Sequence, residues 1–254
     1  MNLFWILLII GFLVGGVRGL LFGLVLGYLA SWMLRSFVGQ KVAGIQAQFL
    51  ESSFAVMGAL CKADGVVTRD EIAAAEAMFD RLNLSAEQRE QAKAAFNRGK
   101  SPDFDLGAEV AEFAAACRGQ RALMIMFLQI QLAAIGGDGQ VHPAEHQMLV
   151  RVARLLGLSE ADVQQLEALL RAGGRRGPGP APKSTLDDAY AALGLTPSAT
   201  DAQVKQAYRR LVSQNHPDKL ASKGLPESMR ELAEERTREI NTAYETIKAA
   251  RGMT

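Results

Sequence analysis

The sequence predicts an all-α protein, and three observations support this fold class. Apolar residues recur at helical spacing in several segments, a helix-turn-helix pattern is repeated at a constant offset, and the N-terminal residues form one long apolar run. The 254 residues are enough for two soluble domains. A formal net charge of +1 argues against nucleic acid as the main partner. The two cysteines, Cys61 and Cys117, lack the spacing of a zinc site or a disulfide framework.

Residues 1–36 are predicted to form a transmembrane helix. Between Leu3 and Leu34 the only charged residue is Arg18, and about 20 apolar residues already span a bilayer. A cleaved signal peptide would begin with basic residues and have a shorter apolar core. Arg35 and Lys41 follow the run, whereas no basic residue precedes it, so the positive-inside rule places the N-terminus outside and the remainder in the cytoplasm. Arg18 is costly near mid-bilayer and is a functional candidate without an assigned role.

Glycine recurs at every fourth position of this run, at Gly11, Gly15, Gly19, Gly23 and Gly27. Such a strip lets two helices approach backbone to backbone, which predicts a parallel homodimer through the membrane helix. The alternative is that glycine is simply frequent in membrane helices. A second alternative is a re-entrant hairpin that turns at Gly15 and Gly16. It would leave the N-terminus on the same side as the soluble part.

Residues 46–172 contain an internal repeat. The acidic turn around Asp64, followed by Glu71, recurs 74 residues later around Asp138, followed by Glu145. A Leu-x-Leu-Ser sequence recurs with the same offset, starting at residues 82 and 156. Two blocks in one register predict a duplicated helical unit.

Helix-start signals place the helices of each repeat. Thr68 and Glu71, and likewise Ser85 and Gln88, have the spacing of a capping box, and Pro143 stands where the first residue of a helix is expected. Each copy is therefore predicted to read as helix, Asp-Gly turn, helix, Leu-x-Leu-Ser turn and helix. Residues 173–184 are rich in glycine and proline and are expected to form a mobile, partly extended linker about 30 Å long.

The second repeat also contains the sequence His142-Pro-Ala-Glu145-His146, which matches the H-x-x-E-H pattern of one class of zinc metalloprotease. The two histidines would face each other one helical turn apart. Pro143 nevertheless predicts that the segment is a helix start, and no third ligand is evident, whereas catalytic zinc needs three protein ligands. A metalloenzyme at this sequence is an alternative function.

Residues 185–254 are predicted to form a helical hairpin. A first apolar stripe comprises Val204, Ala207, Tyr208 and Leu211, and Thr200 with Gln203 has the spacing of a capping box before it. A second stripe comprises Leu232, Ile240, Ala243, Tyr244 and Ile247. Between the helices lies Asn215-His216-Pro217-Asp218-Lys219, where proline favours a turn and leaves His216 and Asp218 exposed.

Leu186 to Ala249 resembles the J domain of DnaJ-type co-chaperones, because "AYRRLV", "NHPDK" and "EINTAYETI" occur in the order of that family. The resemblance implies that the helix before the tripeptide docks on a DnaK-type chaperone and that His216, Pro217 and Asp218 trigger its ATP hydrolysis. Lys205, Arg209 and Arg210 would guide docking on an acidic partner, and Asn215 and Lys219 flank the tripeptide. Thr237 stands where this family often has phenylalanine. The resemblance implies no catalytic site.

The repeat resembles the TerB-like domain, which occurs in tellurite-resistance proteins and in membrane-anchored DnaJ-like proteins. That family is suspected of binding metal through acidic residues, which here would be Asp64, Glu71, Asp138 and Glu145. An acidic turn followed by glutamate is equally an ordinary helix start. The order of the parts implies an inner-membrane co-chaperone with no required cofactor. The alternative is an envelope-stress or capsule signalling adaptor that recruits the chaperone secondarily.

Overall fold

The computed structural model describes residues 3–62, 76–135, 143–174 and 183–253. Regular structure in these ranges is helical throughout, which confirms the all-α class. The chain divides into two units, Met1–Gly44 and Ile45–Thr254. Helix α1, Leu3–Cys61, runs from the first unit into the second.

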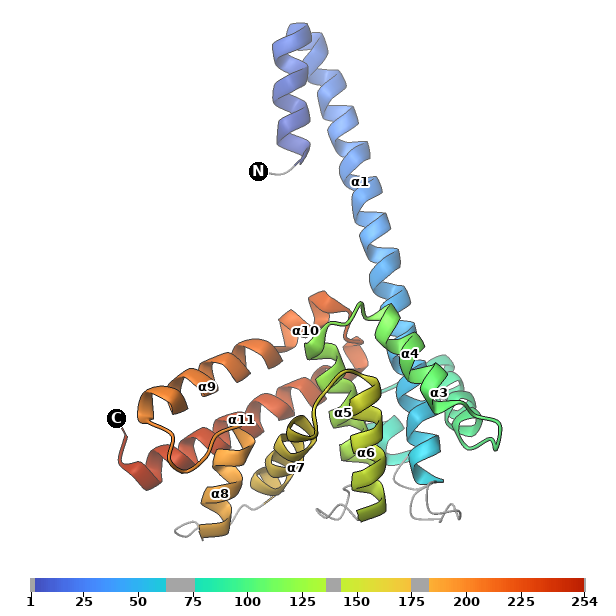
Figure 1. Ribbon diagram of the computed structural model, residues 1–254. Helices are drawn as coiled ribbons and strands as arrows, with labels where there is room; N and C mark the ends of the chain where they lie inside the picture. Colours follow the sequence, from blue (N-terminus) through green and yellow to red (C-terminus); the bar gives the residue numbers. More distant parts are fainter. Residues whose placement is uncertain (1–2, 63–75, 136–142, 175–182, 254) are drawn as a thin grey trace. The chain divides into compact units, whose positions relative to one another are not determined.

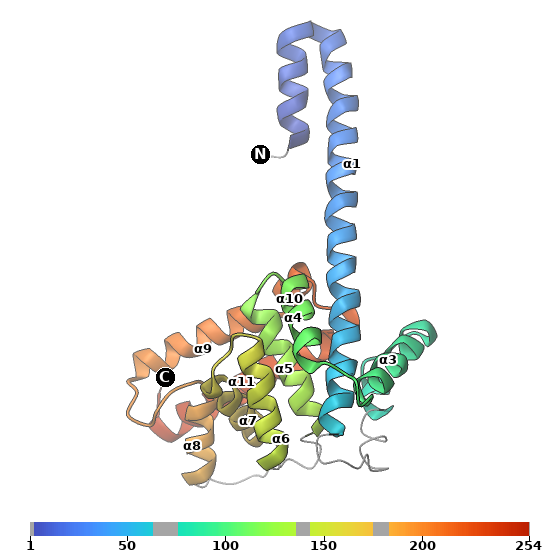
Figure 2. The ribbon, with the colours of Figure 1, turned by 45° about the vertical axis from the view of Figure 1, so that its right-hand side comes forward.

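The smaller unit consists of the N-terminal part of α1. In both views the N-terminal end of this helix folds back alongside its own continuation (Figure 1, Figure 2). Gly16 has φ of +56°, in the left-handed region that glycine adopts at little cost. The predicted glycine strip is therefore divided, with Gly11 and Gly15 before this position and Gly19, Gly23 and Gly27 after it. No helix in the described ranges combines the length and apolar character that a bilayer crossing requires.

The first half of the larger unit is a helical bundle. It contains the end of α1, a helical segment at 76–81, α3 (Ala86–Gly99), α4 (Leu106–Ala116), α5 (Arg121–Ile135), α6 (Pro143–Leu155) and α7 (Glu160–Gly174). Phe49 of α1 lies edge-on to Phe113 of α4, with ring centroids 5.2 Å apart, and Phe113 stacks on Phe127 of α5 at 4.2 Å. These fully buried rings form the centre of the bundle.

Helices α1 and α3 cross with their backbones in close contact. A Cβ atom added to Gly58 would lie 2.1 Å from the carbonyl oxygen of Phe96, and one added to Gly99 would lie 1.8 Å from that of Ala55. Only a residue without a side chain fits at either position. The two glycines therefore set the distance between these helices.

The two Leu-x-Leu-Ser turns of the predicted repeat have the same local geometry. Asn83 and Gly157, which are equivalent in the repeat, both have positive φ, at 51° and 72°. In both copies the following leucine donates its amide back to the preceding helix, Leu84 to Phe79 and Leu158 to Ala153. Ser85 then caps α3 in a capping box with Gln88, as predicted, and α6 begins at Pro143, also as predicted. The Thr68 to Glu71 pair lies outside the described residues.

The second half of the larger unit contains α8 (Lys183–Ala192), α9 (Asp201–Asn215), α10 (Pro217–Lys223), a short 3-10 turn at Glu227–Met229, and α11 (Arg230–Arg251). Figure 1 shows α9 and α11 side by side. Their predicted stripes meet, with Val204, Ala207 and Leu211 of α9 buried together with Ile240, Ala243 and Ile247 of α11. Tyr208 and Tyr244 are partly buried and stack on each other with centroids 4.1 Å apart. Thr200 and Gln203 form the predicted capping box.

Each of the two hydrophobic clusters contains residues from both halves of the larger unit. Ala168 and Leu169 of α7 belong to the cluster formed by α8, α9 and α11. Conversely, Leu220 and Leu232 belong to the cluster of the first bundle. The C-terminal domain is thus packed against the bundle. Of the predicted linker, 173–174 and 183–184 are helical and 175–182 lie outside the described residues.

Candidate functional site

The His-Pro-Asp tripeptide lies at the junction of α9 and α10. His216 is both the C-cap of α9 and the N-cap of α10, and Pro217 is the first residue of α10. Proline suits this position because its missing amide hydrogen would have no partner in the helix. The sequence had predicted an exposed loop; instead, Pro217 and Asp218 belong to the first turn of a short helix.

His216 caps α10 with its side chain. The Asp218 amide donates a hydrogen bond to the imidazole Nδ1 over 3.2 Å. Since Nδ1 accepts this bond, the N–H group of the ring in this arrangement is at Nε2. Nδ1 also lies 3.9 Å from the Asp218 carboxylate. With half of its side chain exposed, His216 can present an N–H donor to a partner.

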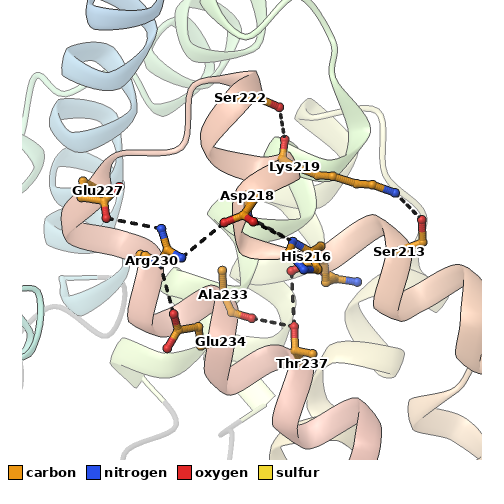
Figure 3. A network of polar contacts seen from close by, with 11 residues as sticks. Ser213, His216, Asp218, Lys219, Ser222, Glu227, Arg230, Ala233, Glu234 and Thr237 are labelled. Atoms are coloured by element: carbon orange, nitrogen blue, oxygen red, sulfur yellow. Dashed lines mark hydrogen bonds and ion pairs between the residues drawn. The ribbon is translucent and has the colours of Figure 1, made fainter.

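Asp218 is held by Arg230, the first residue of α11 (Figure 3). Its carboxylate lies 3.3 Å from Nη2 of Arg230, whose Nε donates to Glu234 at 3.2 Å and whose Nη1 lies 3.7 Å from Glu227. The hydrogen bond to Glu234, followed by the charges of Glu227 and Asp218, raises the pKa of Arg230 above its ordinary value. Arg230 therefore stays charged and orients the Asp218 carboxylate at the surface.

The two flanking residues have different surroundings. Asn215 is buried, and its side-chain amide donates to the Leu211 carbonyl at 2.8 Å. Its own carbonyl lies 3.4 Å from the Thr237 hydroxyl, whose single proton is shared between this carbonyl and that of Ala233, 3.0 Å away. Thr237 therefore supports the junction through hydrogen bonds. Lys219 is exposed and donates to the Ser213 hydroxyl at 2.6 Å (Figure 3).

The predicted basic residues of α9 lie off its buried stripe. Arg209 and Arg210 are exposed and Lys205 is half-buried, on the side of the helix opposite to the buried stripe. The C-terminal domain contacts the bundle mainly through α8, α10 and α11. Packing against the bundle thus leaves His216, Asp218 and the two arginines exposed.

The predicted metal ligands are mostly beyond the described residues. Asp64, Glu71 and Asp138 lie outside these ranges, as does His142 of the H-x-x-E-H sequence, and the side chain of Glu145 is not described either. His146 is described, and its Nδ1 lies 2.7 Å from Glu167 of α7. Within the described part of the chain, no three metal-binding side chains come together.

Sequence reasoning missed Arg230 as a site residue. Its one available signal was the helical spacing of Glu227, Arg230 and Glu234, which is typical of ordinary exposed ion pairs. The contact with Asp218 depends on the turn between α10 and α11, and no periodicity predicts it.

Family models match both halves of the larger unit. The model described as "Tellurite resistance protein TerB" matches residues 51–168, and the DnaJ domain model matches residues 188–251. Together with the His-Pro-Asp junction and the exposed basic helix, these matches define a J-domain protein that also carries a TerB domain.

Curated proteins with this combination are similar over nearly the whole chain. The co-chaperone protein DjlA of Photobacterium profundum is 41% identical over 96% of each chain. DjlA of Escherichia coli strain K12 is 36% identical over 94% of this chain and 93% of its own, and DjlA of Coxiella burnetii is 36% identical over 97% and 96%. The chain belongs to the DjlA family of co-chaperones, which are not enzymes. No solved structure matches it significantly.

Proposed function

We propose that the chain stimulates ATP hydrolysis by a cytoplasmic DnaK-type chaperone through His216, Pro217 and Asp218. The observation that carries this proposal is the helix junction at which His216 and Asp218 are exposed beside the basic face of α9. That face attracts an acidic partner and speeds the encounter, and the tripeptide then contacts the partner at the end of the helix. The chain accelerates a reaction whose catalytic groups belong to the chaperone.

The test is single-turnover ATP hydrolysis by a purified DnaK-type chaperone with the full chain in detergent micelles. Wild type is expected to accelerate hydrolysis, whereas His216→Gln is expected to give almost no acceleration because it removes the capping imidazole. His146→Gln is the matched control, since it alters a histidine that contacts Glu167 in the bundle, and it should stimulate like wild type. Equal stimulation by wild type and His216→Gln would refute the mechanism.

We also propose that the N-terminal run anchors the protein in the inner membrane, with its larger unit in the cytoplasm. Among the described residues, the large apolar side chains that are exposed lie between residues 5 and 33, with Leu155 as the exception. An exposed apolar surface of this kind is typical of membrane or protein contact. Trp5, Tyr28 and Trp32 are more than half exposed, and such aromatic residues favour membrane interfaces.

The position of Gly16 favours a second arrangement of this anchor. Trp5 and Tyr28 lie at nearly equal distances from Gly16 along the chain, so a hairpin turning there would bring both to one interface. A single crossing would place them at opposite interfaces. The proposed parallel homodimer belongs to the single crossing, because only an uninterrupted helix presents Gly11, Gly15, Gly19, Gly23 and Gly27 as one strip.

A further inference from the structure

A cavity of about 370 Å³ lies between the TerB domain and the J domain. Helices α5 and α7 line one side, and α9, α10 and α11 line the other. Its charged and amide-bearing lining residues include Arg121, Asp162, Gln214, Asn215, Lys223 and Arg236. Asn215 directly precedes His216, so the cavity adjoins the junction of the J domain.

Arg236 is the unusual residue of this cavity. It is only 2% exposed, and its Nε atom is buried without a hydrogen-bond partner among the described residues. Burial lowers the pKa of Arg236 to about 10, so the guanidinium is still charged at neutral pH. A buried guanidinium with an unsatisfied Nε atom is costly to retain, so its place on the cavity wall suits an anionic ligand.

The other charges of the cavity do not neutralise Arg236. Asp162 lies 2.6 Å from Arg121; although burial opposes ionisation, hydrogen bonds from Ser159 and the charge of Arg121 lower the pKa of this carboxyl. Asp162 is therefore already paired, and Lys223 and Arg236 remain as excess positive charge. Glu239, one turn along α11, does not line the cavity; it interacts electrostatically with Arg236 and partly compensates its charge, although burial raises the pKa of the Glu239 carboxyl.

We propose that this cavity binds a small phosphate-bearing solute between the TerB and J domains. Its volume lies at the small end of the range for ligand sites and excludes a folded partner. Arginine forks and lysine ammonium groups are the usual recognition groups for phosphate oxygens, and the amides of Gln214 and Asn215 add polar groups to the wall. The ligand would contact residues from both domains.

The test is calorimetric titration of the full chain in detergent micelles with inorganic pyrophosphate, at constant ionic strength. Wild type is expected to bind one pyrophosphate per chain. Lys223→Gln and Arg236→Met, at two lining residues of the cavity, should each weaken binding at least tenfold. Lys248→Gln is the control, because this lysine of α11 does not line the cavity and its loss should leave affinity unchanged.

Arg236→Met also separates a ligand site from a packing role. For this purpose it is combined with Glu239→Gln, so that no buried carboxylate loses its partner. If the arginine is kept for a ligand, this double variant should leave the free protein as stable as wild type or more so, while it abolishes binding. Circular dichroism on heating measures this stability. Absence of saturable pyrophosphate binding, unchanged affinity in Lys223→Gln, or equally tight binding of citrate would each overturn the assignment.

Discussion

At the scale of single residues, Asp218 depends on a group that is distant in sequence. Arg230 contacts Glu227, Glu234 and Asp218 together, so it is restrained on several sides and restrains the Asp218 carboxylate in turn. Asp218 and Glu227 are largely exposed and Arg230 and Glu234 are nearly half exposed, and ion pairs in contact with solvent stabilise folded proteins little. The contact is therefore expected to matter for function more than for folding.

Arg230→Gln should reduce stimulation of the chaperone roughly fivefold, equivalent to about 1 kcal/mol, because Asp218 loses its orienting partner. The loss should be smaller than that caused by His216→Gln. The unfolding temperature should hardly change. Arg238→Gln, an exposed arginine on the same helix, serves as the comparison. Wild-type stimulation by Arg230→Gln would show that Asp218 needs no fixed orientation.

At the scale of elements, the crossing of α1 and α3 depends on two glycines. Neither contact can be relieved by rotating a side chain, because the opposing atoms at Gly58 and Gly99 are backbone carbonyls. The helices must move apart to accept even one methyl group. Such a movement would loosen the packing around Phe54 and Phe79, whose rings lie 4.9 Å apart.

Gly58→Ala should lower the free energy of unfolding by about 1–3 kcal/mol or more, measured by urea titration with circular dichroism. Gly44→Ala, in the same helix, is the matched control, since a Cβ there meets no atom within 4 Å. It should be neutral or stabilising by up to about 1 kcal/mol, because alanine favours the helix. Equal effects of the two substitutions would contradict the close backbone contact.

At the scale of the whole molecule, one helix joins a unit with exposed apolar side chains to a unit with two hydrophobic clusters. The larger unit is held together across its domains by polar contacts as well. Gln165 donates to the Ala192 carbonyl at 2.9 Å, and Arg171 pairs with Asp188 at 3.0 Å. The J domain is therefore presented by the TerB domain as part of one compact unit.

Topology reporters at the two ends of the full chain distinguish the two forms of the membrane anchor. The single crossing predicts an N-terminal reporter outside the cytoplasm and a C-terminal reporter inside it. If both reporters are cytoplasmic, the hairpin at Gly16 is correct and the proposed parallel dimer fails. A C-terminal reporter outside the cytoplasm would contradict both forms, and also the proposed chaperone partner.

The sequence predicted those features that depend on nearby residues. The stripes of α9 and α11, the capping boxes at Ser85 and Thr200 and the helix start at Pro143 are all local, and the structure confirms them. It did not predict α10, because a seven-residue helix after proline leaves too short a pattern.

Long-range polar contacts were beyond sequence reasoning for a different reason. Buried Glu109 accepts hydrogen bonds from Ser52 and Arg98, both over 2.7 Å, and each partner lies on another helix. Helix α11 packs against helices of its own domain and also against α7 of the bundle. Arg236 is buried although it lies outside the apolar stripe that faces α9. The apolar periodicity of a helix predicts one buried face, and it does not predict a second face that is buried by another domain.

His216 ends one helix and starts the next, so no spare residue separates α9 from α10. A chaperone that binds this junction does not have to order a flexible loop. Binding therefore avoids a loss of conformational entropy that costs about 1–2 kcal/mol for each backbone residue. Its association rate should then depend on how quickly charges bring the surfaces together. Raising the ionic strength should slow capture of the chaperone much more than it speeds release.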